Sequence, residues 1–310
     1  MNIVYSQTKQ WNPGDDLILD GVRSLIPENH TFIIFNRHPH INFRSRNGDN
    51  SYCFGVGDDI IDHVIFAGSP EYQTSPNDDI YKLIDKTNVK FSYIGVGGRQ
   101  HVNRPFHKAS VSICRDSAAA KMPNGMMLPC PSIYANRSLD LSVKTKKEKV
   151  AFCFQTGVKY ICSPNGNAHQ TSVRFIERYK PIVICHSYPD YVEASNRGWD
   201  SFYSSDYRDY YDFYENEIDV VVGTRIHGSG WAANYGKPNI TIAHDDRIET
   251  ALNFGSICVN PDFENLCRTF ESLDPSEQSK KIIELRKNTL PKYMEKLSPI
   301  FGTPEWIKNL

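Results

Sequence analysis

The sequence predicts an α/β protein made of two parallel-sheet domains that face a cleft. First, 310 residues exceed the ~100–200 that one ordinary core holds, which favours two domains of similar size. Second, short apolar runs alternate with loops or helix-sized segments in both halves, as in sheets whose parallel strands are joined by helices. We therefore expect two Rossmann-like domains.

The N-terminal α/β domain is predicted over residues 1–145. Its apolar runs have the length of buried strands, and they lie at residues 1–5, 30–35, 63–66, 91–96 and 110–114. A polar, Lys-rich stretch without apolar periodicity follows at 138–149. We place the domain boundary in that stretch.

The C-terminal α/β domain is predicted over residues 146–285. Strands predicted at 149–154, 181–186, 218–223 and 238–243 alternate with helices predicted at 171–179, at 206–216 and after 224. The aromatic residues of 202–214 are spaced for one helical face, which core packing explains better than stacking on sugar rings. Residues 286–310 are predicted to form a helical tail on the outside of the molecule, in which Pro291 ends or kinks the helix.

Composition excludes several classes of function. The 35 Lys and Arg residues nearly balance 36 Asp and Glu, so the chain lacks the basic surplus of a nucleic-acid binder. No apolar stretch reaches the ~18–20 residues that span a bilayer, and the first residues do not resemble a signal peptide, so we expect a cytoplasmic protein with reduced cysteines. The histidines and cysteines show no metal-ligand spacing, and we predict neither a structural zinc nor a cofactor.

The most informative segment runs from residue 218 to residue 247. An apolar strand is followed by Gly223 and Thr224, which are typical of a turn and a helix N-terminus. This order places Arg225 and His227 at the carboxyl end of a strand, where ligands of open α/β sheets collect. An Arg can hold a phosphate or carboxylate and a His can exchange a proton near neutral pH, although both could equally be satisfied by partners within the protein.

The chain resembles the polysaccharide pyruvyl transferase family in the order of its motifs. The segment DVVVGTRIH, the small-residue helix GSGWAANYGKP and the following ITIAHDDR are similar to the hallmark of that family. At the front, an opening strand is followed by Asn12, Gly14, Asp15 and Asp16. Between these ends, HVIFAGSPEY, FSYIGVGG and SVSICRDSAAAKM match in order, while Gly68-Ser69 replaces the usual Gly-Gly and MMLPCPSIY lacks an acidic residue before its second proline.

The resemblance implies a fold like that of GT-B glycosyltransferases and the transfer of a pyruvyl group. The donor would be phosphoenolpyruvate, and the product a pyruvate ketal on a sugar of a surface polysaccharide or its lipid-linked precursor. Arg225 would stabilise the departing phosphate and His227 would act as general acid and base. The other predicted substrate-binding residues are Arg115, Gly14, Asp15, Asp16, Gly228, Asp246 and Arg247.

Several alternatives stay open at this point. Arg115 could pair with Asp116, Asp15 and Asp16 could stabilise a helix N-terminus, and Asp246 with Arg247 could form a solvated turn. A glycosyltransferase with a nucleotide-sugar donor and a non-catalytic carbohydrate-binding protein are the alternative functions. The sequence leaves the acceptor sugar, peripheral membrane contact and the oligomeric state open.

Overall fold

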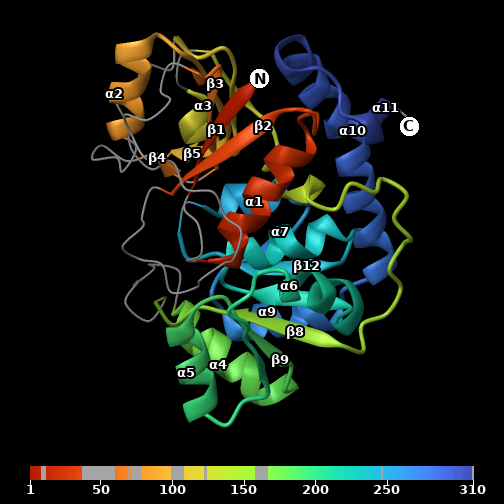
Figure 1. The fold of residues 1–310 in the computed structure, drawn as a ribbon. Helices are drawn as coiled ribbons and strands as arrows, with labels where there is room; N and C mark the ends of the chain where they lie inside the picture. Colours follow the sequence, from red (N-terminus) through yellow and green to blue (C-terminus); the bar gives the residue numbers. More distant parts are fainter. Residues whose placement is uncertain are drawn as a thin grey trace. The chain divides into compact units, whose positions relative to one another are not determined.

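The computed structural model describes residues 1–7, 12–36, 60–68, 70–71, 78–98, 108–121, 124–157, 167–245 and 247–308. The chain divides into two compact units (Figure 1). Unit 1 combines Met1–Trp11, Asp15–Arg137 and Asn288–Leu310, and unit 2 combines Asn12–Gly14 with Ser138–Lys287. The division after Arg137 falls at the start of the polar stretch, whereas the sequence placed it inside that stretch.

Unit 1 contains a wholly parallel sheet in the order β2-β1-β3-β5-β6-β7, with β4 paired to β5. Its core lies among Val64, Phe66, Phe91 and Tyr93, which are at most 2 % exposed. The strands are β1 (Asn2–Gln7), β2 (Thr31–Asn36), β3 (His63–Ala67), β4 (Pro70–Glu71), β5 (Lys90–Gly98), β6 (Ser112–Cys114) and β7 (Gly125–Met127). The helices between them are α1 (Pro13–Ser24), α2 (Asp78–Thr87) and α3 (Ser117–Ala120), and a 3₁₀ turn follows at Pro131–Tyr134.

Unit 2 contains a second parallel sheet, in the order β10-β9-β8-β11-β12-β13. Numbered along the chain, this is the 3-2-1-4-5-6 order of a Rossmann fold. The strands are β8 (Val150–Phe154), β9 (Ile182–Cys185), β10 (Ser201–Phe202), β11 (Val220–Gly223), β12 (Asn239–Ile242) and β13 (Ile257–Val259). The helices are α4 (Ala168–Tyr179), α5 (Tyr188–Asn196), α6 (Asp209–Asp212), η6 (Phe213–Glu217, a π-helical turn), α7 (Ile226–Asn234), α8 (Ile248–Leu252) and α9 (Phe263–Glu271).

The central strands of unit 2 are buried on both faces, as their unbroken apolar runs predict. Every residue of β11 and β12 is buried, and Phe152, Val220 and Val222 form part of one core with residues of α4 and α9. Within the aromatic run, Tyr210 and Tyr214 are fully buried against Trp231 of α7. Core packing therefore explains these two tyrosines.

The C-terminal helix does not end at Pro291, one of the two outcomes predicted there. Helix α10 (Pro275–Phe301) continues through Pro291, and α11 (Glu305–Lys308) follows it. An internal proline costs a helix roughly 3 kcal/mol, but Leu290, Tyr293 and Leu297 are at most 4 % exposed, and burying these side chains offsets that cost. The last part of the helix is therefore built into unit 1 through buried side chains.

Helices long and apolar enough to cross a bilayer are not found among the described residues.

Candidate functional site

The carboxyl edge of the unit 2 sheet brings polar residues from distant parts of the chain together. The strand registers place Cys153 of β8 beside Gly223 of β11, and Phe154 beside Cys185 of β9. The segments that follow these three strands therefore leave the sheet at one edge. The strand order reverses between β8 and β11, and such a switch point is where open α/β sheets bind ligands.

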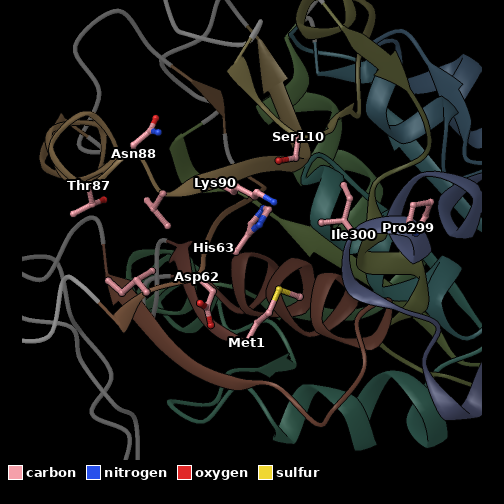
Figure 2. Close-up of a pocket in the computed structure, with 11 residues that line it drawn as sticks. Met1, Asp62, His63, Thr87, Asn88, Lys90, Ser110, Pro299 and Ile300 are labelled. Atoms are coloured by element: carbon pink, nitrogen blue, oxygen red, sulfur yellow. The ribbon is translucent and has the colours of Figure 1, made fainter.

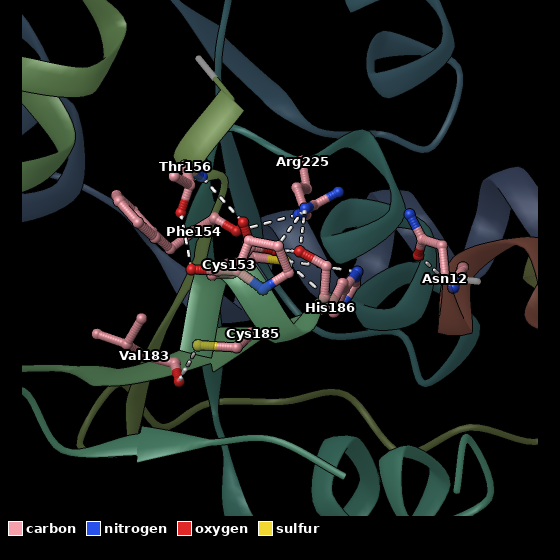
Figure 3. A network of polar contacts seen from close by, with 12 residues as sticks. Asn12, Cys153, Phe154, Thr156, Val183, Cys185, His186 and Arg225 are labelled. Atoms are coloured by element: carbon pink, nitrogen blue, oxygen red, sulfur yellow. Dashed lines mark hydrogen bonds and ion pairs between the residues drawn. The ribbon is translucent and has the colours of Figure 1, made fainter. Parts of the chain in front are cut away.

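Arg225 lies at this switch point as the N-cap of α7. Its Nε donates a hydrogen bond to the carbonyl oxygen of Phe154 at 3.0 Å, and its Nη2 forms an ion pair with Asp190 (Figure 3). Nη2 also lies 3.4 Å from Ser187 Oγ. Nη1 has no partner among the described residues, and the side chain is 14 % exposed.

Asp190, in the first turn of α5, is the internal partner of Arg225. Its side chain is 2 % exposed, and it accepts hydrogen bonds from the Thr156 backbone N–H at 2.9 Å and from Ser187 Oγ at 2.7 Å. Burial is the largest single effect and lowers the pKa of Arg225, but the charge and hydrogen bond of Asp190, together with the nearby Cys153 and Cys185, outweigh it, so the pKa lies above its ordinary value. The guanidinium therefore stays charged.

His227 lies two residues further on, in the first turn of α7, and is partly exposed. Its neighbour is Gly14, which belongs to unit 2 and not to the unit that contains most of α1. A Cβ atom on Gly14 would lie 2.1 Å from His227 Cγ, so only a glycine allows the ring to pack there. The structure thus brings two of the predicted site residues, Gly14 and His227, into contact.

A buried polar cluster lies behind Arg225 (Figure 3). His186 Nε2 lies 3.5 Å from Cys153 Sγ and 3.2 Å from the Tyr214 hydroxyl, and all three side chains are fully buried. Burial raises the pKa of the Cys153 thiol to about 12, although the nearby Arg225 charge acts in the opposite direction. Cys153 is therefore a packed thiol and not a nucleophile.

The loop after β12 holds a second arginine–carboxylate pair. Asp245 Oδ2 accepts hydrogen bonds from Arg247 Nε at 2.8 Å and Nη2 at 2.5 Å. Burial alone would raise the pKa of Asp245, but the hydrogen bonds and charge of Arg247 hold it below its usual range. Arg247 keeps 27 % of its side chain exposed, and Asp246 lies outside the described residues.

The remaining predicted site residues are placed by packing. Gly228 lies against β8, where a Cβ atom would approach Cys153 Cβ to 2.6 Å, so its missing side chain lets α7 lie close to the sheet. In unit 1, Asp15 and Asp16 occupy the first turn of α1, and the side chain of Asp16 is buried. Arg115 is 4 % exposed and packs over Gly97 at the end of β5.

Asp116, the alternative partner predicted for Arg115, is the N-cap of α3. One carboxylate oxygen of Asp116 accepts from the Ala119 backbone N–H at 2.9 Å, and both oxygens lie 3.2 Å from the Gly98 N–H.

A pocket lies in unit 1, at the amino edge of its sheet. A hollow of about 940 Å³ opens at the amino ends of β1, β3 and β5, between Met1, His63, Lys90 and Ile300 (Figure 2). Several of its polar groups are already bonded within the unit: Asp62 Oδ2 accepts from the Asn2 N–H at 2.7 Å, and His63 Nε2 lies 2.8 Å from Ser92 Oγ. Ligands of open α/β sheets bind at the carboxyl ends of strands, so this pocket does not compete with the Arg225 site.

Sequence reasoning did not identify Ser187 and Asp190 as site residues. A signal was present, because SYPD directly follows the predicted strand at 181–186, much as the R-x-H segment follows its own strand. Parallel strands end at one edge, so polar residues after neighbouring strands are candidates for one site. The sequence did not show which strands would be neighbours in the sheet, and so did not show which of these loops would meet.

Several solved structures have the same fold, and each of the three described next matches nearly the whole length of this chain. The Staphylococcus aureus MnaA structure with UDP matches with a TM-score of 0.55 and 12% identity, covering 96% of this chain and 98% of that one. UDP-GlcNAc 2-epimerase from Neisseria meningitidis, bound to UDP-GlcNAc, matches with a TM-score of 0.52 and 10% identity, and the match covers 96% of this chain and 100% of that one. The spinosyn rhamnosyltransferase SpnG matches with a TM-score of 0.58 and 10% identity, and the match covers 96% of this chain and 100% of that one.

These similarities confirm the predicted fold class, two parallel-sheet α/β units of the GT-B type. Models of known protein families give no match to the chain. Curated proteins give none either.

Proposed function

We propose that the protein is a sugar-modifying transferase that binds a phosphorylated donor at the carboxyl edge of β8 and β11. One observation carries the proposal: Arg225 lies at the switch point of a Rossmann-ordered sheet, at the N-terminus of α7, with one guanidinium edge unused among the described residues. A helix N-terminus favours an anion, and a guanidinium binds phosphate oxygens directly.

A nucleotide sugar is the first candidate donor. The structural neighbours include enzymes solved with UDP and with UDP-GlcNAc, and a rhamnosyltransferase. The charges at the site fit a donor of modest charge, because Asp190 compensates Arg225 and Asp245 compensates Arg247. In such a reaction Arg225 would stabilise the charge on the departing diphosphate.

Phosphoenolpyruvate is the second candidate donor, supported by the R-x-H segment and by the order of motifs along the chain. In this reaction the enol methylene gains a proton, one sugar hydroxyl bonds to C2, and a second hydroxyl closes the ketal as inorganic phosphate leaves. His227 would supply and remove protons, while Arg225 would bind the phosphate. Asp15 and Arg115 stay the candidates for binding the acceptor sugar.

Thermal denaturation with separate ligands tests the proposal and distinguishes the two donors. A ligand that binds only the native state at about 100 times its Kd stabilises it by ~2.7 kcal/mol, which raises Tm by several degrees. We expect UDP and UDP-GlcNAc to raise Tm in the wild type and less in Arg225→Lys, because an ammonium lacks the planar fork. A rise with phosphoenolpyruvate alone would select pyruvyl transfer, and no rise with any of these ligands would contradict a phosphorylated donor.

A further inference from the structure

We propose that Asp190 is a positioning and specificity residue of the anion site: it fixes the Arg225 guanidinium and offsets its charge, so that simple inorganic anions bind weakly. The inference deepens the proposed function and rests on it, because it concerns the same phosphate-binding arginine.

The Asp190 carboxylate joins the ends of three elements. Its Oδ1 accepts from the Thr156 N–H after β8, and its Oδ2 accepts from Ser187, the N-cap of α5, and from Arg225, the N-cap of α7. The carboxylate is 2 % exposed, so water does not screen it as it would a surface carboxylate. Its position is therefore set by groups that belong to the sheet edge itself.

Two anchors fix the plane of the guanidinium. Nε donates to the Phe154 carbonyl oxygen at 3.0 Å, and Nη2 contacts Asp190. Because the guanidinium is planar, holding two of its nitrogens also sets the direction in which Nη1 points. A donor would therefore meet a single preset N–H pair, and not a mobile side chain.

Charge compensation gives Asp190 its second effect. An arginine beside a buried carboxylate presents a much smaller net positive charge to an incoming anion than an arginine alone. Inorganic phosphate or pyrophosphate, which depends mainly on charge, is then held weakly. A complete donor makes further contacts through its sugar or its organic part, so the pair discriminates in favour of complete donors.

If the Asp190–Arg225 ion pair had only a structural role, neutralising Asp190 would change anion affinity in a different direction. If Asp190 only stabilised the fold, neutralising it would lower stability and leave anion affinity unchanged or reduced. If it offsets the charge of Arg225, the same change raises anion affinity even while it destabilises the fold. The sign of the affinity change thus separates the two roles.

The test is calorimetric titration of inorganic pyrophosphate into the wild type and four variants at low salt. Asp190→Asn keeps the size of the side chain and removes its charge, and we expect pyrophosphate to bind about tenfold more tightly, with an advantage that shrinks as NaCl screens it. Asp190→Glu keeps the charge and should stay within about twofold of the wild type. Glu193→Gln is the matched control, because Glu193 is a carboxylate on the same helix that pairs with His169 and Arg197 and has no ion pair with Arg225.

Arg225→Gln separates failure of this inference from failure of the proposed function. Loss of pyrophosphate binding in Arg225→Gln, together with unchanged binding in Asp190→Asn, would overturn the role of Asp190 alone. No binding in the wild type, or equal binding in Arg225→Gln, would overturn the anion site and the inference with it. If Asp190→Asn is unfolded without ligand, pyrophosphate should restore its folded circular-dichroism spectrum, and failure to do so would count against the proposal.

Discussion

Individual residues at the Arg225 site are governed by charge pairing. Arg225 and Arg247 each contact a carboxylate, and those contacts orient both guanidinium groups. His227 is partly exposed, as Arg225 and Arg247 are, and packs against Gly14. An imidazole can exchange protons near neutral pH, so we propose His227 as the acid–base residue.

Replacing His227 tests that role. We expect His227→Ala and His227→Gln each to lower turnover by about 10²-fold or more, since neither side chain can carry a proton at neutral pH. Steady-state kinetics with the donor identified by thermal denaturation measures the effect, and circular dichroism checks that the fold is kept. Full activity in His227→Gln would show that the ring acts by packing or hydrogen bonding alone.

The Cys153 thiol is expected to be unreactive in the native protein. Burial raises its pKa to about 12, and the thiolate is the reactive form, so iodoacetamide at pH 8 should leave Cys153 unmodified until the protein is unfolded. Mass spectrometry of digested protein, labelled with and without urea, measures this. Labelling of Cys153 in native protein would contradict the buried cluster with His186.

At the scale of elements, α7 owes its position to small residues that face β8. Gly228 of α7 leaves no room for a Cβ atom, which would approach Cys153 Cβ to 2.6 Å and Sγ to 2.9 Å, and Gly223 at the end of β11 leaves none beside Cys153 either. The close approach of helix to strand in turn places the N-cap Arg225 within hydrogen-bonding distance of Phe154 at the end of β8. Packing of the element and geometry of the site are thus coupled.

Adding one methyl group at Gly228 should destabilise unit 2. We expect Gly228→Ala to lower the free energy of unfolding by about 1–3 kcal/mol, because the new Cβ overlaps the Cys153 side chain. Urea unfolding followed by circular dichroism gives the value. Gly157→Ala serves as control, since the nearest atom to a Cβ there is the Gln155 side-chain amide at 3.7 Å; equal stability of the two variants would contradict the close approach of α7 to β8.

For the molecule as a whole, a buried histidine in unit 1 links stability to pH. His63 is 1 % exposed and hydrogen bonds to Ser92, and burial together with the Lys90 charge lowers its pKa to about 4. In the unfolded chain an ordinary histidine has a pKa near ~6.5. As pH falls through this window, the unfolded chain binds a proton that the native state excludes, so the free energy of unfolding decreases.

This linkage predicts a loss of up to about 3 kcal/mol of stability from His63 between roughly pH 6.5 and pH 4. The free energy of unfolding is measured with urea across this pH range for the wild type and for His63→Gln. Subtracting one pH profile from the other removes the contributions of the other titrating groups. The variant should lose less stability on acidification than the wild type. Parallel pH profiles for the two proteins would rule out a depressed pKa at His63.

Local sequence determined much of the fold, because strands and helices follow from short-range patterns. The apolar runs that became β8, β9, β11 and β12 are readable without any knowledge of their neighbours, since burial on both faces requires an unbroken apolar segment. Helix α10 shows the limit of local rules: the Pro291 penalty is local, but the burial that offsets it comes from the rest of unit 1.

The sequence by itself determined that Arg225 and His227 would follow a buried strand and begin a helix, because turn and capping preferences act over a few residues. Only the tertiary structure decided that Arg225 would meet Asp190, 35 positions earlier in the chain, and that His227 would pack on Gly14. The physical reason is the parallel sheet: its strand order, fixed by packing of the whole unit, chooses which distant loops share one carboxyl edge.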